Sequence, residues 1–171
     1  MEDIYHRLSE AYGFPESKYL SKICQKCLTE QEALILLALP GTAEEVAGKV
    51  RMDVSSVQST LVELFNKGFA FYDPVEGKRR YALMSNWVEL RDALVTGKHV
   101  DRFGNETLDL LAVMYDEEVS PAFDVEGSEF RVIPVHETIE PGTEILSYEK
   151  ISGILEKAET IAVMHCPCRT V

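Results

Sequence analysis

The stretch DVSSVQSTLVELFNKGFAFYDPVEGKRRYAL, residues 53–83, decides the predicted fold. Its first half has the spacing of a helix with one buried face, and the residues that face inward are Val57, Leu61, Leu64 and Phe65. Asp53 can cap the start of this helix, and Gly68 follows its last residue, Lys67, where glycine is favoured. The second half alternates around a turn at Pro74–Gly77, which is typical of a β-hairpin.

Two shorter helices are predicted before this stretch. Thr29, with a glutamate three residues later, has the pattern of a capping box, and the apolar run that follows ends at Pro40-Gly41. Thr42 can cap a second helix over residues 43–50. Three helices, the last two joined by a short turn, followed at once by a hairpin make a winged helix-turn-helix. We therefore expect residues 29–84 to form a winged helix-turn-helix domain.

Helical segments are predicted on both sides of this domain. Residues 1–28 form an N-terminal helical extension in which the second helical stretch starts at Pro15. Residues 85–129 contain helices, of which the first is capped by Ser85. Their acidic end, from Asp116, lacks a period and is interpreted as a loop.

The last segment, residues 130–171, is predicted to form a strand, a helix and a strand that ends in the sequence CPCR. A strand, a helix and a strand within about 40 residues permit a parallel unit. The predicted fold class is therefore α+β: an N-terminal helical extension and a winged helix-turn-helix, followed by a small α/β segment.

Composition limits the classes of function. The net charge is −12, and residues 101–171 hold 15 of the 29 acidic residues but only 5 of the 17 basic ones. This acidic part should repel phosphate, and it either favours basic partners or serves solubility. The first 20 residues are too polar for a signal peptide, and no apolar run is long enough to span a bilayer. With only four cysteines, we expect a cytoplasmic protein without a membrane partner.

The cysteines are candidate metal ligands. Cys166 and Cys168 lie two residues apart, so in an extended segment both face the same side, and Arg169 favours their thiolates. Cys24 and Cys27 have the CxxC spacing of zinc and iron–sulfur sites and are candidate additional ligands. They also share a helical stripe with apolar residues, so they can instead be small buried hydrophobes.

The predicted winged helix can be tested against the needs of DNA binding. Outward positions of its third helix include Ser55, Gln58 and Ser59, which can hydrogen-bond bases, and the hairpin carries Lys78, Arg79 and Arg80. Across residues 30–84, six basic residues meet eight acidic ones. A dedicated DNA-binding domain usually has a strongly basic face. We therefore favour a packing or protein-docking module over a DNA-binding one.

Catalysis has no support in the sequence. There is no nucleophile–base pattern, no phosphate-binding glycine loop and no zinc motif with a general base beside it. We therefore expect no catalytic activity in this chain.

The stretch RVIPVHETIEPGTEILSYEKISGILEKAETIAVMHCPCR, residues 131–169, resembles the linker region of a group of 4Fe-4S ferredoxin-type iron–sulfur proteins from anaerobic microbes. Residues 29–50 resemble the first two helices of the winged helix that precedes this linker in the group. The matching pieces of the linker are Ile133–Val135, Ile139–Ile145, Tyr148-Glu149, Ile161–Val163 and Cys166–Arg169.

This resemblance implies a function and a site. Cys166 and Cys168 would be ligands of a 4Fe-4S cluster, whereas Cys24 and Cys27 match nothing in the group's pattern. The group's further cysteines would follow Arg169, so we expect this chain to be either the N-terminal part of a longer electron-transfer protein or a shortened relative. Its partners would be its own downstream cluster domain or a redox partner protein, and zinc is the alternative metal.

A second function explains the winged helix more directly. The chain would be a redox- or metal-responsive transcriptional regulator, with the cysteines as the sensor and DNA as the partner of the third helix and the hairpin. The residues at the DNA would be Ser55, Gln58, Ser59, Lys78, Arg79 and Arg80.

Overall fold

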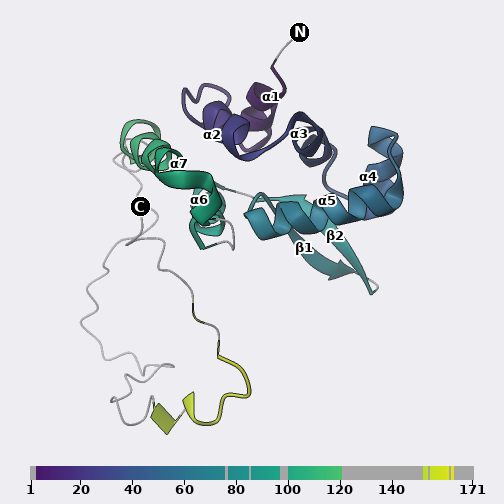
Figure 1. Cartoon of the computed structure of the whole chain (residues 1–171), viewed down its shortest axis with the longest axis vertical. Coiled ribbons are helices and arrows are strands. Elements are labelled where there is room, and N and C mark those ends of the chain that lie inside the picture. Colours follow the sequence, from purple (N-terminus) through teal and green to yellow (C-terminus); the bar gives the residue numbers. More distant parts are fainter. Residues whose placement is uncertain are drawn as a thin grey trace, which may run out of the picture. The chain divides into compact units, whose positions relative to one another are not determined.

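The computed structural model describes residues 3–75, 77–84, 86–96, 100–120, 152–153, 155–161 and 163. The chain divides into two compact units, of which the first includes residues 1–124 and the second covers residues 125–164. In its described part, the first unit combines helices with a two-stranded antiparallel sheet (Figure 1). This confirms the α+β class.

Two short helices begin the first unit, α1 (Ile4–Ala11) and α2 (Leu20–Cys27). The prediction that the second helical stretch starts at Pro15 is wrong. The hydroxyl oxygen of Ser17 accepts hydrogen bonds from the amides of Tyr19 and Leu20, at 3.2 and 2.9 Å. These bonds hold the residues before Leu20 in a turn, so the helix begins only there.

The next two helices, α3 (Glu30–Leu37) and α4 (Ala43–Val50), both start with a capping box. In each box the threonine hydroxyl accepts the backbone N–H of the glutamate three residues later, and that glutamate's carboxylate accepts the threonine N–H. The pairs are Thr29 with Glu32 and Thr42 with Glu45. The box at Thr29 and the cap at Thr42 were both predicted, so these predictions are confirmed.

Helix α5 (Val54–Lys67) has the boundaries that the sequence predicts. The carboxylate of Asp53 accepts the Ser56 amide at 3.0 Å, and Gly68 ends the helix with a φ of 86°. Three of its four predicted inward residues are buried, namely Val57, Leu61 and Leu64.

Phe65 is the exception on this helix, because its side chain is 43% exposed and the prediction that it faces inward is wrong. It lies one position beyond Leu64, about 100° further around the helix. There its ring meets Tyr72 of the hairpin, with the ring centroids 5.0 Å apart.

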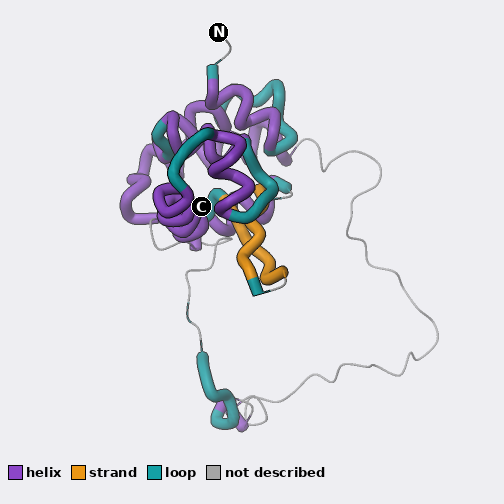
Figure 2. The backbone as a smooth tube through the Cα atoms, turned by 90° about the vertical axis from the view of Figure 1, so that its right-hand side faces the viewer, coloured by secondary structure: helices purple, strands orange, loops and turns teal. Residues whose placement is uncertain are grey.

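Strands β1 (Ala70–Val75) and β2 (Lys78–Leu83) form the predicted hairpin, which Figure 2 shows projecting from the helices. Pro74 pairs with Arg79 and Val75 with Lys78, so the turn is shorter than the predicted Pro74–Gly77 turn. A proline is tolerated in β1 because the strand has a free edge that needs no N–H donor. Gly77 has a φ of 77°, the left-handed conformation that short hairpin turns require.

Two further helices follow, α6 (Trp87–Thr96) and α7 (Val100–Met114). The side-chain oxygen of Asn86 accepts the Glu89 amide at 3.0 Å, so Asn86 caps α6. Ser85, the predicted cap, lies outside the described residues. Helix α7 is broken at Gly104, whose φ is 72°.

The chain continues from α7 into a short π-helix, η1 (Tyr115–Val119). The prediction that the acidic loop starts at Asp116 is therefore wrong. The carboxylate of Glu118 accepts hydrogen bonds from the Ser17 hydroxyl and the Lys18 amide, at 2.6 and 2.8 Å. These contacts with the segment between α1 and α2 hold the acidic residues in place.

The second unit is described at few positions. Residues 152, 153 and 155 are helical, within the predicted amphipathic helix, whereas residues 160, 161 and 163 are described without the predicted strand. The remainder of the predicted strand–helix–strand segment, with Cys166 and Cys168, lies outside the described residues. None of the described helices is both long and apolar enough to cross a membrane.

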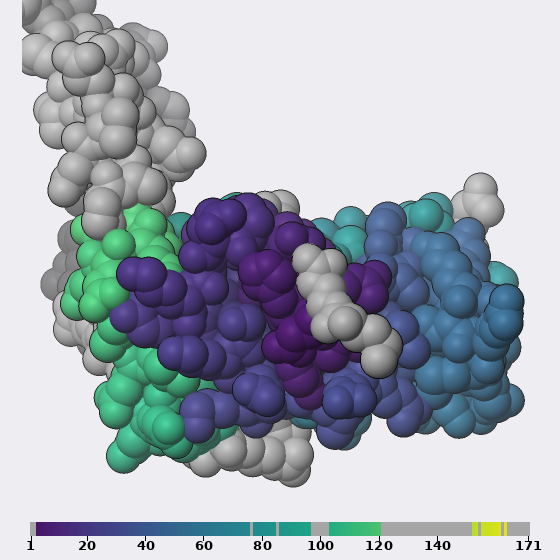
Figure 3. All heavy atoms as spheres, turned by 90° about the horizontal axis from the view of Figure 1, so that it is seen from above, coloured from purple at the N-terminus to yellow at the C-terminus, as the bar shows by residue number. Residues whose placement is uncertain are grey.

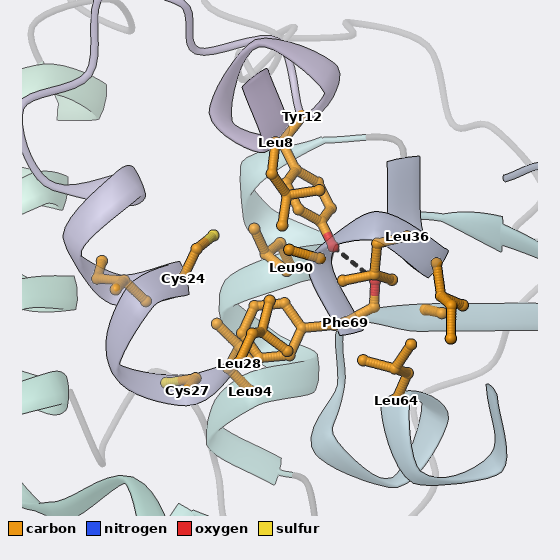
Figure 4. Close-up of a cluster of buried hydrophobic side chains, with 14 of the residues drawn as sticks. Leu8, Tyr12, Cys24, Cys27, Leu28, Leu36, Leu64, Phe69, Leu90 and Leu94 are labelled. Atoms are coloured by element: carbon orange, nitrogen blue, oxygen red, sulfur yellow. Dashed lines mark hydrogen bonds between the residues drawn. The ribbon is translucent and has the colours of Figure 1, made fainter. Parts of the chain in front are cut away.

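One hydrophobic cluster runs through the first unit, from Tyr5 in α1 to Val119 in η1. Figure 3 shows the N-terminal helices lying between α4 and α7. Within the cluster, the buried Tyr12 hydroxyl donates to the backbone oxygen of Phe69 at 2.6 Å (Figure 4). The helices before and after residues 29–84 therefore share their core with them.

Gly68 lies at the tightest point of this core. A Cβ atom at this position would be 2.4 Å from the backbone oxygen of Ala93 in α6. No side chain fits at that distance, and the φ of 86° also disfavours any residue with a Cβ. Helix α6 therefore crosses the end of α5 at a position that only glycine can occupy.

We predict that Gly68→Ala lowers the free energy of unfolding by about 2–4 kcal/mol, because it adds a backbone clash to the left-handed strain. Urea unfolding, followed by the fluorescence of the single tryptophan, Trp87, measures the change. The control is Gly48→Ala in α4, where an added Cβ meets nothing within 4 Å. The control should be neutral or raise stability by about 0.5–1 kcal/mol. Equal stabilities for Gly68→Ala and the wild type would contradict the prediction.

Candidate functional site: helix α5, the hairpin and the cysteines

The outward face of α5 carries Ser55, Gln58 and Ser59, all exposed as predicted. The two serine hydroxyls already bind their own helix: Ser55 donates to the Asp53 carboxylate at 2.6 Å and Ser59 to the Ser55 carbonyl at 3.0 Å. The Gln58 amide lies 3.4 Å from the Tyr81 hydroxyl, a long hydrogen bond that a ligand could replace.

The three basic residues of the hairpin also have partners within the chain. The Lys78 ammonium lies 3.3 Å from the Glu44 carboxylate, and the Arg80 guanidinium lies 2.7 Å from Glu45. The Arg79 guanidinium lies over the Tyr72 ring, 4.5 Å from its centroid. Each of the three cations therefore already has a partner within the chain, which a phosphate would have to replace or share.

The two carboxylates of α4 remain ionised in this arrangement. The pKa of Glu44 is lowered by its own backbone N–H, then by Thr42 and by Lys78. The hydrogen bond from the Thr42 N–H has the largest effect and lowers the pKa of Glu45; desolvation opposes it, and the charge of Arg80 lowers the pKa further. Two negative charges therefore accompany the positive charges of the hairpin.

A shallow pocket of about 270 Å³ lies where α4, α5 and β2 meet. It is lined by Ala43, Glu44, Gln58, Lys78 and Arg79. Its walls thus combine a carboxylate, an amide and two cations. A ligand with both donors and acceptors, such as a polypeptide, matches this lining better than an anion alone does.

Two other basic residues of this region hold the fold together, a role that the sequence did not indicate. The Lys49 ammonium donates to the carbonyls of Ala38 and Pro40, at 2.6 and 3.0 Å, beyond the C-terminal end of α3. The Lys67 ammonium is mostly buried and pairs with Glu32 at 2.7 Å. Both lysines reach groups outside their own helices, Lys49 across 11 and 9 residues and Lys67 across 35, so no local sequence signal indicates these contacts.

Cys24 and Cys27 lie in the hydrophobic core, on the inner face of α2 (Figure 4). Burial, with a smaller effect of the neighbouring Cys27, raises the pKa of Cys24 far above its ordinary value. Burial raises the pKa of Cys27 to about 11, despite a hydrogen bond with Thr107 and the charge of Lys67. Both are therefore protonated thiols at neutral pH, which agrees with their interpretation as small hydrophobes.

The described residues contain no group of three or more His, Cys, Asp or Glu side chains arranged to hold a metal ion. The structure thus brings Gln58 of α5 together with Lys78 and Arg79 of the hairpin around one pocket, whereas Ser59 lines a different pocket with Thr29 and Glu32. It places Cys24 and Cys27 elsewhere, in the core. The assignment of Cys166 and Cys168 as ligands stays a prediction.

Comparisons with protein-family models, with curated proteins and with solved structures find no match for this chain.

We predict that Cys24 and Cys27 resist alkylation in the folded protein. In a variant with Cys166→Ala and Cys168→Ala, iodoacetamide at neutral pH should label them only through opening of the core. Burial raises the pKa of Cys27 to about 11, so the closed core presents almost no thiolate at neutral pH. Opening restores the ordinary thiol pKa of about 8.5, so labelling of the open form should accelerate about tenfold for each pH unit below that value.

The same variant unfolded in urea is the control and should be labelled rapidly. Rapid labelling of the folded protein would contradict the prediction. Protection that appears only when zinc is added would instead indicate a metal site at these thiols.

Proposed function

We propose that this chain is the winged-helix and linker part of a 4Fe-4S electron-transfer protein. In this proposal, α5 and the hairpin dock onto protein, either the chain's own downstream cluster domain or a redox partner protein. Cys166 and Cys168 contribute two of the cluster's ligands.

The order and connections of the elements support a winged helix-turn-helix. Helices α4 and α5 are separated only by residues 51–53, and the hairpin starts at Ala70, two residues after Gly68. The carbonyl and N–H of Gly41, before α4, both bond to Tyr81 of β2 at 2.9 Å. The hairpin is thus attached beside α4 and α5, as the wing is in this fold.

The observation that carries the docking proposal is the pairing of the hairpin's cations with α4. DNA binding gains its affinity from lysine and arginine side chains that replace counterions at phosphates. Here Lys78 and Arg80 face Glu44 and Glu45, so approaching phosphates would meet two carboxylates as well. A surface of mixed charge is suited to a protein partner, where complementary charges provide specificity.

The cluster part of the proposal is supported by the chemistry of the CPCR sequence and by its resemblance to iron–sulfur proteins. A 4Fe-4S cluster takes four thiolates, and it would supply one-electron transfer. The thiols of Cys24 and Cys27 are buried and protonated, so Cys166 and Cys168 are the better ligand candidates.

Anaerobic reconstitution of the gene's full product with iron and sulfide tests the cluster assignment. We expect the broad visible absorption of an iron–sulfur cluster. The Cys166→Ala/Cys168→Ala variant should lose most of this absorption, because each missing thiolate removes a ligand. The matched control, Cys24→Ala/Cys27→Ala, should retain it. An absent signal in the wild type, or equal signals in the two variants, would contradict the assignment.

A redox- or metal-responsive transcriptional regulator remains the second candidate function. The exposed Ser55, Gln58 and Ser59 on α5 favour it, because they occupy the outward positions from which a recognition helix reads bases. The exposed Arg79 near the hairpin turn could also reach a phosphate or a minor groove.

Titration of the wild-type protein into duplex DNA at two salt concentrations separates the two functions. If the surface docks onto protein, we expect dissociation constants weaker than about 10⁻⁴ M even at low salt, the weak end of non-specific binding. A regulator would bind far more tightly, and its affinity would fall steeply with salt. Tight binding of that kind would reject the docking proposal.

A further inference from the structure

We infer that Glu44 and Glu45 are specificity-determining residues that exclude nucleic acid from the surface formed by α5 and the hairpin. This inference rests on the proposed function in one respect, because it treats that surface as a protein-docking site. It adds the residues that make the site selective.

The two carboxylates bind cations that phosphates would need. Glu44 binds Lys78 and Glu45 binds Arg80, which are two of the three basic residues of the hairpin. A carboxylate presents oxygen acceptors to an ammonium or guanidinium group much as a phosphate does. At the start of α4, Glu44 and Glu45 therefore bind Lys78 and Arg80 in the way that two backbone phosphates could.

The two ion pairs alone would not keep a phosphate away. All four side chains are substantially exposed, between 43% and 66%, and exposed ion pairs contribute little to stability. A phosphate could displace either carboxylate from its cation. The exclusion must therefore come from the negative charge that stays beside the cations after the pair has opened.

The fold prevents the carboxylates from moving far away. The Glu45 carboxylate also accepts the Thr42 amide at 2.9 Å, so the capping box holds it at the start of α4. The paired backbone bonds between Gly41 and Tyr81 hold that helix end against β2. A phosphate that reached Lys78 or Arg80 would thus remain close to one or both carboxylates and be repelled.

The same charges are compatible with a protein partner. The pocket beside this surface is lined by Glu44, Gln58, Lys78 and Arg79, so it contains both donors and acceptors. A polypeptide can match both signs of charge and supply both hydrogen-bond donors and acceptors. A nucleic-acid backbone can match only the positive sign.

The test is the Glu44→Gln/Glu45→Gln double variant of the full chain. Glutamine keeps the size of the side chain, and it can still complete the capping box at Thr42. The binding of a fluorescently labelled DNA duplex is measured by anisotropy at several salt concentrations. We expect about tenfold tighter binding than for the wild type at low salt, and a steeper salt dependence by up to about two released ions.

A second double variant, Glu10→Gln/Glu106→Gln, changes the net charge of the chain by the same amount. Glu10 lies 3.8 Å from the His6 ring and Glu106 lies 2.8 Å from the Lys26 ammonium, but these two acids belong to α1 and α7, which lie apart from the hairpin (Figure 1). This control should bind DNA no more tightly than the wild type does. Glu44→Gln alone leaves the capping box untouched, and it should bind about threefold more tightly.

The outcomes separate this inference from the proposed function. If the wild type binds DNA weakly and neither Gln variant of α4 binds better than the control, the inference is overturned and the docking proposal stands. If the control gains as much as the α4 variants, net charge is responsible and the inference is again overturned. If the wild type itself binds DNA tightly, the docking proposal fails as well.

Discussion

The close approach of Gly68 to helix α6 is the constraint on which the rest of the first unit depends. At this residue α5 ends, the chain reverses into β1, and α6 passes with no room for a Cβ atom. The next residue, Phe69, is fully buried and its carbonyl accepts a hydrogen bond from the hydroxyl of Tyr12, which directly follows α1. The N-terminal helices, the hairpin and α6 thus meet within two residues, and this junction fixes the direction in which the hairpin leaves α5.

Features of the fold that depend on neighbouring residues could be predicted from the sequence. The capping box at Thr29 and the helix end at Gly68 involve groups a few residues apart, and their residue types reveal them. The helical conformation of η1 could not be predicted, because it depends on Glu118 reaching Ser17, 101 residues earlier. The exposure of Phe65 likewise depends on where the hairpin lies, which no local pattern contains.

In the candidate site, too, features set by neighbouring residues could be predicted from the sequence, and contacts between distant residues could not. Helical spacing was enough to place Ser55, Gln58 and Ser59 on an exposed face. From the sequence, the acidic residues within 30–84 could only be counted against the basic residues of the same segment. The structure shows which cations they meet: Lys78 and Arg80 lie 34 and 35 residues from their partners in α4. Because each of these two cations lies beside a carboxylate, the surface around them carries both signs of charge. Composition alone cannot reveal this pairing.

The two capping boxes give their glutamates different mechanical roles. Glu32 holds the start of α3 and also reaches Lys67 at the end of α5, and their side chains are only 13% and 19% exposed. Glu45 holds the start of α4 and reaches Arg80, but these side chains are 51% and 43% exposed. Water and ions compete for the second pair far more than for the first. We therefore expect a bound partner to separate Arg80 from Glu45 more easily than Lys67 from Glu32, so that the hairpin side of this domain can exchange its internal ion pairs for contacts with a partner.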